Sequence, residues 1–183
     1  EAERNFVLAI FDCRQGNQNK AIDHLQTAVS LGLPIERILA GPRELFEPLQ
    51  KNEAYAKWLA EKQKPLLHGP MLTSVTDTAA QIWVRTAQPT QVVLSATTAG
   101  PNSKPLSECT TQTSAADDYT GIIHLRDLEP NTQYQYQLSI NGQPQTEQFK
   151  FRTMPTAGEP AKFDVGFGGG AGYTPQFNHM WTT

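Results

Sequence analysis

The sequence of 183 residues has few cysteines, no excess of basic charge and no long apolar run. Cys13 and Cys109 are its two cysteines, and their wide separation excludes a metal knuckle or a redox CxxC pair, so we expect two free thiols. A formal net charge of −3 argues against a protein that binds nucleic acid, which needs a basic face. Because no window approaches about 18 consecutive apolar residues, no membrane span is expected.

The sequence also lacks the common catalytic signatures, since it contains no GxSxG, HExxH or Walker loop. Its histidines are scattered, and none has a second candidate ligand at the spacing that a metal site on one element requires. Asp117 and Asp118 form a pair of carboxylates, which we interpret as a solvated loop before a strand. The sequence therefore predicts no catalytic, cofactor-binding or metal-binding residue. The four histidines are His24, His68, His124 and His179.

The pattern over residues 1–64 is helical. Apolar residues recur at the spacing i, i+3, i+4, i+7 of an amphipathic helix, which Gly32 and Pro34 bring to an end. Further short helices are expected at 35–39, from Pro42 onwards, and at 53–62. A glycine turn joins the first two helices into a hairpin. The apolar positions of the second helix are Ala21, Ile22, Leu25, Ala28, Val29 and Leu31.

After residue 65 the pattern changes to that of an all-β sandwich, with turn residues every 8 to 14 positions. The dipeptide of Asn141 and Gly142 is a strong hairpin signal. The predicted fold class is thus an α+β multidomain chain, a helical hairpin followed by a β-sandwich. Strands are expected near 67–75, 79–86, 91–98, 106–113, 120–127, 133–140 and 146–153.

Residues 16–31 resemble a tetratricopeptide repeat (TPR), with the turn glycine and the small residues Ala21 and Ala28 in register. That resemblance implies an accessory surface for a protein partner. Because such repeats usually need at least three units, either earlier repeats were lost from this chain or the hairpin packs against the next domain. We expect Trp58 and Leu59 to pack against the sandwich.

Leu128, Pro130, Thr132 and Tyr134 resemble the E–F corner of a fibronectin type III domain. The resemblance implies that the ring of Tyr134 is buried and that its hydroxyl bonds back to the corner backbone. The orientation of Trp83 stays open, because strand alternation turns it away from its apolar neighbours whereas the family likeness would bury it.

A longer series of motifs resembles the alkaline phosphatases of the PhoD type. The series runs GPM at 69–71, QIWVRT at 81–86, LEPNT at 128–132, FRTMP at 151–155 and FGGG at 167–170. In that family a metal-dependent phosphoesterase domain follows an Ig-like N-terminal module. The resemblance implies a parent enzyme that hydrolyses phosphate esters and holds a divalent or ferric metal.

The resemblance also implies a division of the chain. Residues 1–64 would be the TPR-like segment, 65–155 the fibronectin III-like sandwich, and 156–183 the truncated start of the metallophosphoesterase domain. The chain would then be a non-catalytic N-terminal region, inactive alone, from a secreted or periplasmic protein. The family's turn often carries a metal-binding cysteine, and glycine occupies 168–170 here.

Two other interpretations of the sequence are possible. The pattern of Gly166, Gly168 and Ala171 fits a dinucleotide-binding loop, but Pro175 interrupts the helix that must follow. Alternatively, the chain is a non-enzymatic interaction or adhesion module built from a TPR-like hairpin and a fibronectin III-like domain. The sequence that continues beyond Thr183 would discriminate an enzyme from such a module.

Overall fold

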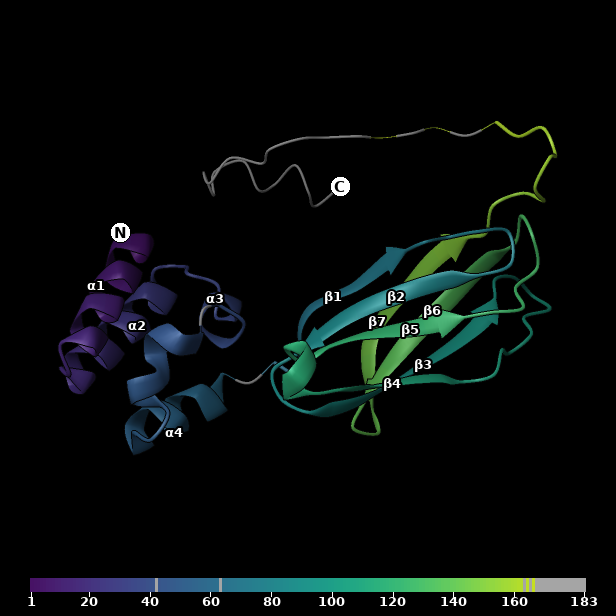
Figure 1. Cartoon of the computed structure of the whole chain (residues 1–183). Coiled ribbons are helices and arrows are strands. Elements are labelled where there is room, and N and C mark those ends of the chain that lie inside the picture. The colour runs from purple at the N-terminus through teal and green to yellow at the C-terminus, as the bar shows by residue number, and fades with distance from the viewer. Residues whose placement is uncertain (42, 63, 163, 165, 167–183) are drawn as a thin grey trace.

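The computed structural model describes residues 1–41, 43–62, 64–162, 164 and 166 (Figure 1). A group of helices comes first in the chain and lies at one end of a β-sandwich (Figure 1). The helical elements are α1 (Ala2–Arg14), α2 (Gln18–Ser30), α3 (Glu36–Leu39), the 3-10 helix η1 (Arg43–Leu49) and α4 (Glu53–Glu61).

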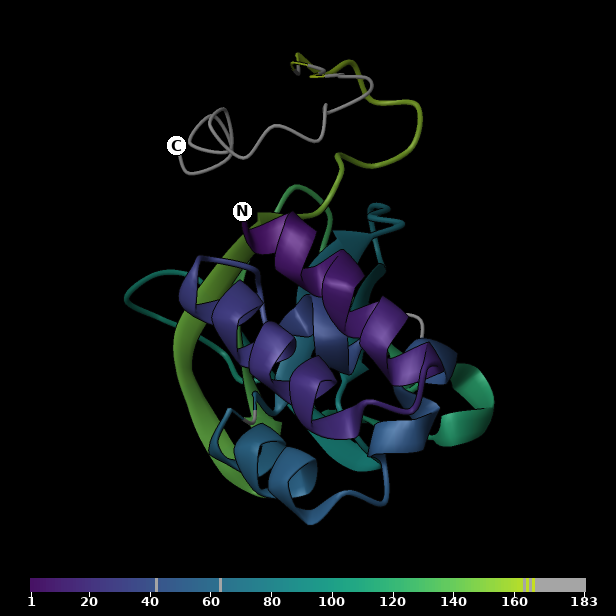
Figure 2. The ribbon, with the colours of Figure 1, turned by 90° about the vertical axis from the view of Figure 1, so that its left-hand side faces the viewer.

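Helices α1 and α2 pack as a hairpin, as the sequence predicts (Figure 2). The turn between them needs a residue with positive φ, which Gly16 supplies at +78°. Ala9, Ala21 and Ala28 are fully buried, so small side chains let the two helices approach closely. The ring of Phe6 on α1 meets that of Phe46 on η1 edge to face, with centroids 5.7 Å apart. The helices thus share one apolar core.

The expected short helices are present, with one difference in type. The segment from Arg43 to Leu49 is a 3-10 helix, and Pro48 lies inside it. Proline lacks the N–H that a longer α-helix would need, so the segment stays short. Asn52 then caps α4 by accepting a hydrogen bond from the backbone N–H of Tyr55 at 3.2 Å.

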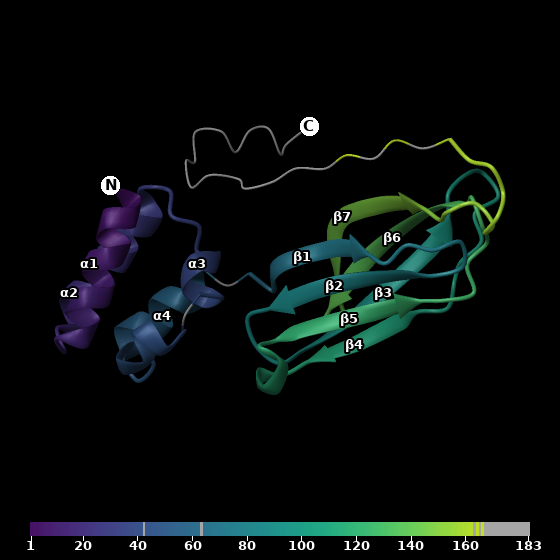
Figure 3. The same ribbon diagram turned by 45° about the horizontal axis from the view of Figure 1, so that its top comes forward.

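All seven predicted strands are present and form two antiparallel sheets. One sheet has the order β1-β2-β5 and the other β4-β3-β6-β7 (Figure 3). The expected start of β4 at residue 106 is too early, because the strand begins at Cys109, although Leu106 already donates its N–H to the carbonyl of Ala96 on β3. The strands are β1 (Leu66–Thr73), β2 (Ala80–Thr86), β3 (Thr90–Thr98), β4 (Cys109–Thr113), β5 (Thr120–Leu125), β6 (Gln133–Ile140) and β7 (Gln143–Arg152).

The sandwich core follows from the two-residue period of its strands. Tyr134, Tyr136 and Leu138 are buried on the inner face of β6, and Phe151 is buried beside Tyr134 on the neighbouring strand β7. Asn141 and Gly142 join these strands with φ of +48° and +76°, the backbone that a tight hairpin turn between twisted strands requires. β7 therefore begins directly after the turn, three residues earlier than expected at 146.

Strand alternation decides the orientation of Trp83. Ile82 and Val84 are fully buried between the sheets, and Trp83 lies half-buried on the outer face of β2. The burial that the family likeness suggested for this tryptophan is therefore not found. A strand cannot turn adjacent side chains to the same face, and two aliphatic residues take the inner one.

Candidate functional site

Asp118 joins the helical segment to the sandwich. It follows the short 3-10 helix η2 (Ala115–Asp117) with φ of +51°, a left-handed conformation that aspartate tolerates. Its two carboxylate oxygens pair with Arg43 from η1 and Arg85 from β2. Arg85 Nη2 also donates to the carbonyl oxygen of Ala40 at 2.8 Å. One aspartate thus holds two arginines from opposite sides of the junction.

Two further contacts strengthen this junction. The Arg43 guanidinium lies over the ring of Tyr119, with its carbon 4.7 Å from the ring centroid, a cation–π arrangement. Lys64 pairs with Glu36 at the start of α3. Burial alone would raise the pKa of Glu36, but the hydrogen bond and charge of Lys64, together with a backbone hydrogen bond, lower it overall. The folded state therefore favours the ionised carboxylate.

These contacts differ from what the sequence suggested. Asp117 and Asp118 lie in an exposed connection before β5, as predicted, but Asp118 also binds both arginines. Asp117 instead accepts a hydrogen bond from the hydroxyl of Ser114 at 3.0 Å. Trp58 was expected to pack against the sandwich, but it belongs to the buried core of the helical segment, next to Tyr55. No local signal distinguishes Asp118 from Asp117, because both arginines are distant in sequence.

A cleft of about 670 Å³ separates α4 from the near ends of the strands. Leu59 lines it, as do Tyr55 and Lys64 on the helical side, with Gln88 and Asn141 from the sandwich. Burial, with a smaller effect of the Cys13 thiol, raises the pKa of Tyr55 to about 12, so its phenol is neutral at ordinary pH. The cleft offers packing surface and hydrogen-bonding groups, and its lysine is already paired with Glu36.

The three histidines that the structure describes do not come together. His24 bonds to Asn5 Oδ1 at 3.0 Å and lies 3.5 Å from Asp12 Oδ2, whereas His68 and His124 are exposed on β1 and β5. Within the described residues no three histidine, cysteine, aspartate or glutamate side chains form a group that could hold a metal ion. His179 and the glycine run at 168–170, with the proposed dinucleotide loop, lie outside the described residues.

The remaining sequence features have simple outcomes. Cys13 is buried and Cys109 half-buried, and neither forms a disulfide, as predicted. Burial raises the pKa of both thiols, which makes them poor nucleophiles. In the described part of the chain no helix is long and apolar enough to cross a membrane.

The predicted corner is present at the far end of the sandwich. The Tyr134 ring is 2% exposed and stacks on Phe151 with centroids 5.4 Å apart. Its hydroxyl accepts a hydrogen bond from the backbone N–H of Glu129 at 2.8 Å. The prediction for Tyr134 is therefore confirmed, and the corner holds the connection between β5 and β6 in place.

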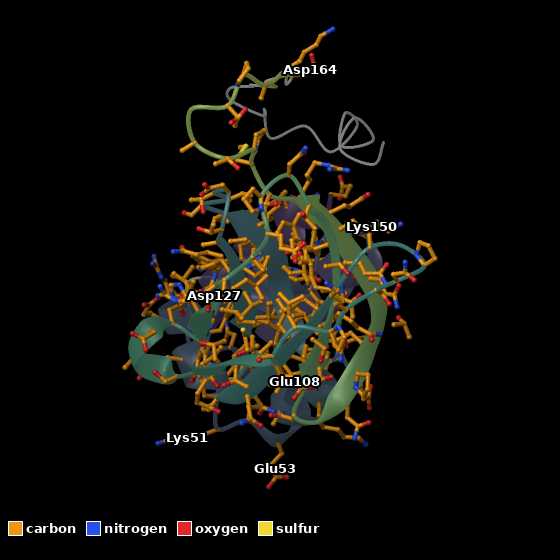
Figure 4. The ribbon with its side chains drawn as sticks, turned by 90° about the vertical axis from the view of Figure 1, so that its right-hand side faces the viewer. Lys51, Glu53, Glu108, Asp127, Lys150 and Asp164 are labelled. Carbon is orange, nitrogen blue, oxygen red and sulfur yellow. The ribbon has the colours of Figure 1, made fainter. Side chains whose placement is uncertain are left out.

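The corner also anchors the chain where it leaves β7. The Thr153 hydroxyl donates to the carbonyl of Glu129 at 2.6 Å and accepts from the N–H of Thr132 at 2.9 Å. Met154 donates its N–H to the carbonyl of Thr76 at 3.0 Å and accepts from the N–H of Asn131 at 2.9 Å. Figure 4 views this end of the sandwich, with Asp164 labelled in the segment that leaves it. The exit of the chain is therefore held from two connections at once.

One family model and several solved structures match this chain. A family described as "Domain of unknown function (DUF7800)" matches residues 63–157, just over half of the chain. Among curated proteins, no sequence matches. The solved structure of PhoD is similar over 49% of this chain, at 17% identity and a TM-score of 0.43, and the match covers 19% of the PhoD chain.

Two further solved structures are similar to part of this chain. A fibronectin type III domain from the human KIAA0970 protein has a TM-score of 0.41 and 12% identity, covering 67% of this chain and 97% of that one. The sensor domain of the anti-sigma factor RsgI4 in Pseudobacteroides cellulosolvens has a TM-score of 0.35 and 20% identity, covering 50% and 97%. The structure itself is a set of helices followed by a sandwich of two antiparallel sheets. By the match over its sandwich, the chain belongs to the family described as Domain of unknown function (DUF7800).

Proposed function

We propose that this chain is the non-catalytic N-terminal region of a PhoD-like, metal-dependent phosphatase. In that protein the sandwich is a structural module, and the phosphoesterase domain begins within residues 156–183. The proposal rests on the order of the sequence motifs from residue 69 to residue 170. Substrates of the parent protein would be phosphate esters, and the helical segment would be an accessory part.

One structural observation carries the proposal. Two of the motifs that create the resemblance, LEPNT at 128–132 and FRTMP at 151–155, bond directly to each other. Arg152 Nη1 donates to the carbonyl of Asn131 at 2.7 Å, and Asn131 in turn donates to Met154. These motifs therefore act together to hold the departing chain in one position. Such an anchored exit suits a module that presents a following domain.

A metal ion would belong to the downstream domain of the parent protein under this proposal. Bound there, it would polarise a phosphoryl oxygen and activate the attacking water. The residues described here would orient that domain rather than touch the phosphate. Their role would be structural, since the pairing of Asp118 with Arg43 and Arg85 holds the helical segment against the sandwich.

The experiment compares the protein encoded by the complete gene with the 183-residue chain. Both are purified and assayed for hydrolysis of an aryl phosphate with calcium, manganese or ferric iron. We expect metal-dependent turnover from the longer protein and none above a buffer control from the chain of 183 residues. Hydrolysis by the pure 183-residue chain, or a gene that continues without a metallophosphoesterase sequence, would contradict the proposal.

A second candidate function, protein interaction through the helical segment, has one specific observation in its favour. Val7 and Phe11 are four residues apart on α1 and both are exposed, Phe11 to 59%. Residues at this spacing share one helix face, so α1 presents an apolar strip to solvent. That strip suits a partner helix, in agreement with the TPR-like interpretation of the segment. Loss of partner binding in Phe11→Ser, with turnover unchanged, would support this function.

A further inference from the structure

The outer face of the β1-β2-β5 sheet carries a row of large apolar side chains. Met71 on β1 pairs with Trp83 on β2, and Trp83 pairs with Ile122 on β5. Met71 is 53% exposed and Ile122 is 45% exposed, with Trp83 half-buried between them. The three side chains therefore form one continuous apolar strip across the sheet. Figure 3 shows β1, β2 and β5 side by side.

The opposite outer face has a different character. In the described residues no large exposed hydrophobic side chain lies on β3, β4, β6 or β7. Their outward positions are mainly glutamine, serine, threonine, lysine and arginine, and Val93 is the half-buried aliphatic exception. A sheet with one solvated face normally alternates apolar inside with polar outside. One sheet of this sandwich follows that rule and the other breaks it across all three strands.

The apolar row also has little charge beside it. The neighbouring pairs on one side are Thr73 with Gln81 and Gln81 with His124. On the other side lies Arg85, whose guanidinium is bound by Asp118 and Ala40. A surface that meets this face must therefore be apolar at its centre and needs no compensating charge.

The area of the face limits what can bind it. Three strands spaced about 4.8 Å apart, with a rise of about 3.3 Å over about seven residues, cover roughly 330 Å². A stable complex of separate molecules buries about 800 Å² on each partner. A free partner or a second copy would thus be held weakly. A tethered partner is present at an effective concentration of the order of millimolar, so a small face suffices.

The chain leaves the sandwich beside this face. Met154 is bonded to Thr76, in the connection between β1 and β2, and its own side chain is 50% exposed. Residues 156–162 are exposed. Twelve residues from 155 to 166 span up to about 40 Å when extended, more than the length of the face. The polypeptide after residue 166 can therefore reach any part of the apolar row.

We propose that the outer face of β1-β2-β5 is the docking surface for the domain that comes after residue 166 in the same polypeptide. The inference rests on the proposed function in one respect, that a further domain is present there. The first residues of that part have the matching chemistry. From 167 to 183 there is no aspartate, glutamate, lysine or arginine, and the large apolar residues are Phe167, Tyr173, Phe177, Met180 and Trp181. Docking would fix the downstream domain against the module that anchors its start.

Hydroxyl-radical footprinting with mass spectrometry tests the proposal. The 183-residue chain and the protein encoded by the complete gene are exposed to the same radical dose. We expect labelling of Met71 and Trp83 to be at least tenfold slower in the longer protein. Phe11, on the exposed strip of α1, is the internal control and should be labelled at the same rate in both.

A matched pair of variants in the longer protein adds a second measurement. Ile122→Thr removes apolar surface from the row and keeps a β-branched side chain, and Val93→Thr makes the same kind of change on the polar face. Ile122→Thr should return Met71 labelling toward the rate in the 183-residue chain, and Val93→Thr should leave it unchanged. Circular dichroism of both variants verifies that each is folded before labelling.

The outcomes separate this inference from the proposed function. Equal labelling of Met71 in the two proteins overturns the docking surface, whatever the phosphatase assay shows. Protection that disappears on dilution would mean a second copy as the occupant and also overturns it. A downstream domain that protects Met71 but hydrolyses no phosphate ester supports the docking surface and contradicts the proposed phosphatase.

Discussion

The hydroxyl of Tyr134 should contribute measurably to the stability of the sandwich. It accepts the N–H of Glu129 at 2.8 Å in a partly buried position, so Tyr134→Phe leaves that donor without its partner. An unsatisfied backbone donor costs about 1–3 kcal/mol, and partial access to water places this one near the lower end. We expect Tyr134→Phe to lose about 1 kcal/mol in the free energy of unfolding. Tyr134→Ala also removes a ring stacked on Phe151 and should lose about 3–5 kcal/mol.

The measurement is urea denaturation of the 183-residue chain followed by circular dichroism, with the slope m compared between variants. Tyr136→Phe is the matched control, because Tyr136 lies on the same strand and face and stacks on Phe149 at 5.3 Å. Its hydroxyl makes no hydrogen bond within the described residues. Removing that hydroxyl should therefore change stability by no more than about 0.5 kcal/mol.

Two results would refute this reasoning. The first is a Tyr134→Phe chain as stable as wild type, which would mean that the corner bond contributes nothing. The second is an equal loss in Tyr134→Phe and Tyr136→Phe, which would assign the effect to the loss of any phenol from the core. A changed slope m in either variant would point to altered compactness of the native or unfolded state rather than to the bond.

Three further predictions concern charged and buried groups. Asp118→Asn should lower the free energy of unfolding by no more than about 1 kcal/mol, since Asp118 is half-exposed, and this loss should shrink in high salt. Asp117→Asn should leave the stability unchanged, and urea melts at two salt concentrations measure both variants. The folded-state pKa of Glu36 is lowered, so the contribution of this carboxylate to stability is complete above its ordinary pKa of 4.5 and is lost as the pH falls further. Glu36→Gln should therefore show a smaller drop in urea midpoint between pH 7 and pH 3 than wild type. Burial raises the pKa of Tyr55 from 10 to about 12, so wild type should lose stability as the pH rises through that interval, and Tyr55→Phe should lose less in melts at pH 9 and 11.

Local patterns explain what could be predicted from the sequence. The strands follow from alternation, and the corner from a motif in which Tyr134 lies five residues from the N–H that it binds. The hairpin turn at Asn141 and Gly142 sets the register of β6 and β7 beside the turn, and an irregularity between Gln137 and Ser139 shifts it before Tyr136 pairs with Phe149. The position of Trp83 also follows from alternation, against the expectation from family likeness.

Local patterns could not predict contacts between residues that are far apart in the chain. Asp118 and Arg43 are 75 residues apart, and nothing near Asp118 marks it as different from Asp117. Trp58 has the spacing of an amphipathic helix, but that spacing does not tell which of two cores it enters. The fold places it in the buried cluster of the helical segment, which also contains residues of α1, α2 and η1.

The sequence by itself determined the elements, because helix and strand periods, turn residues and the tyrosine corner act over a few residues. Only the tertiary structure decided which elements meet. It brought Arg43 and Arg85 together at the carboxylate of Asp118, and it aligned Met71, Trp83 and Ile122 in one exposed row. The physical reason is that strand register and the packing of the two parts depend on all contacts at once. A one-residue shift in β1 or β5 would break the row and leave each local pattern unchanged.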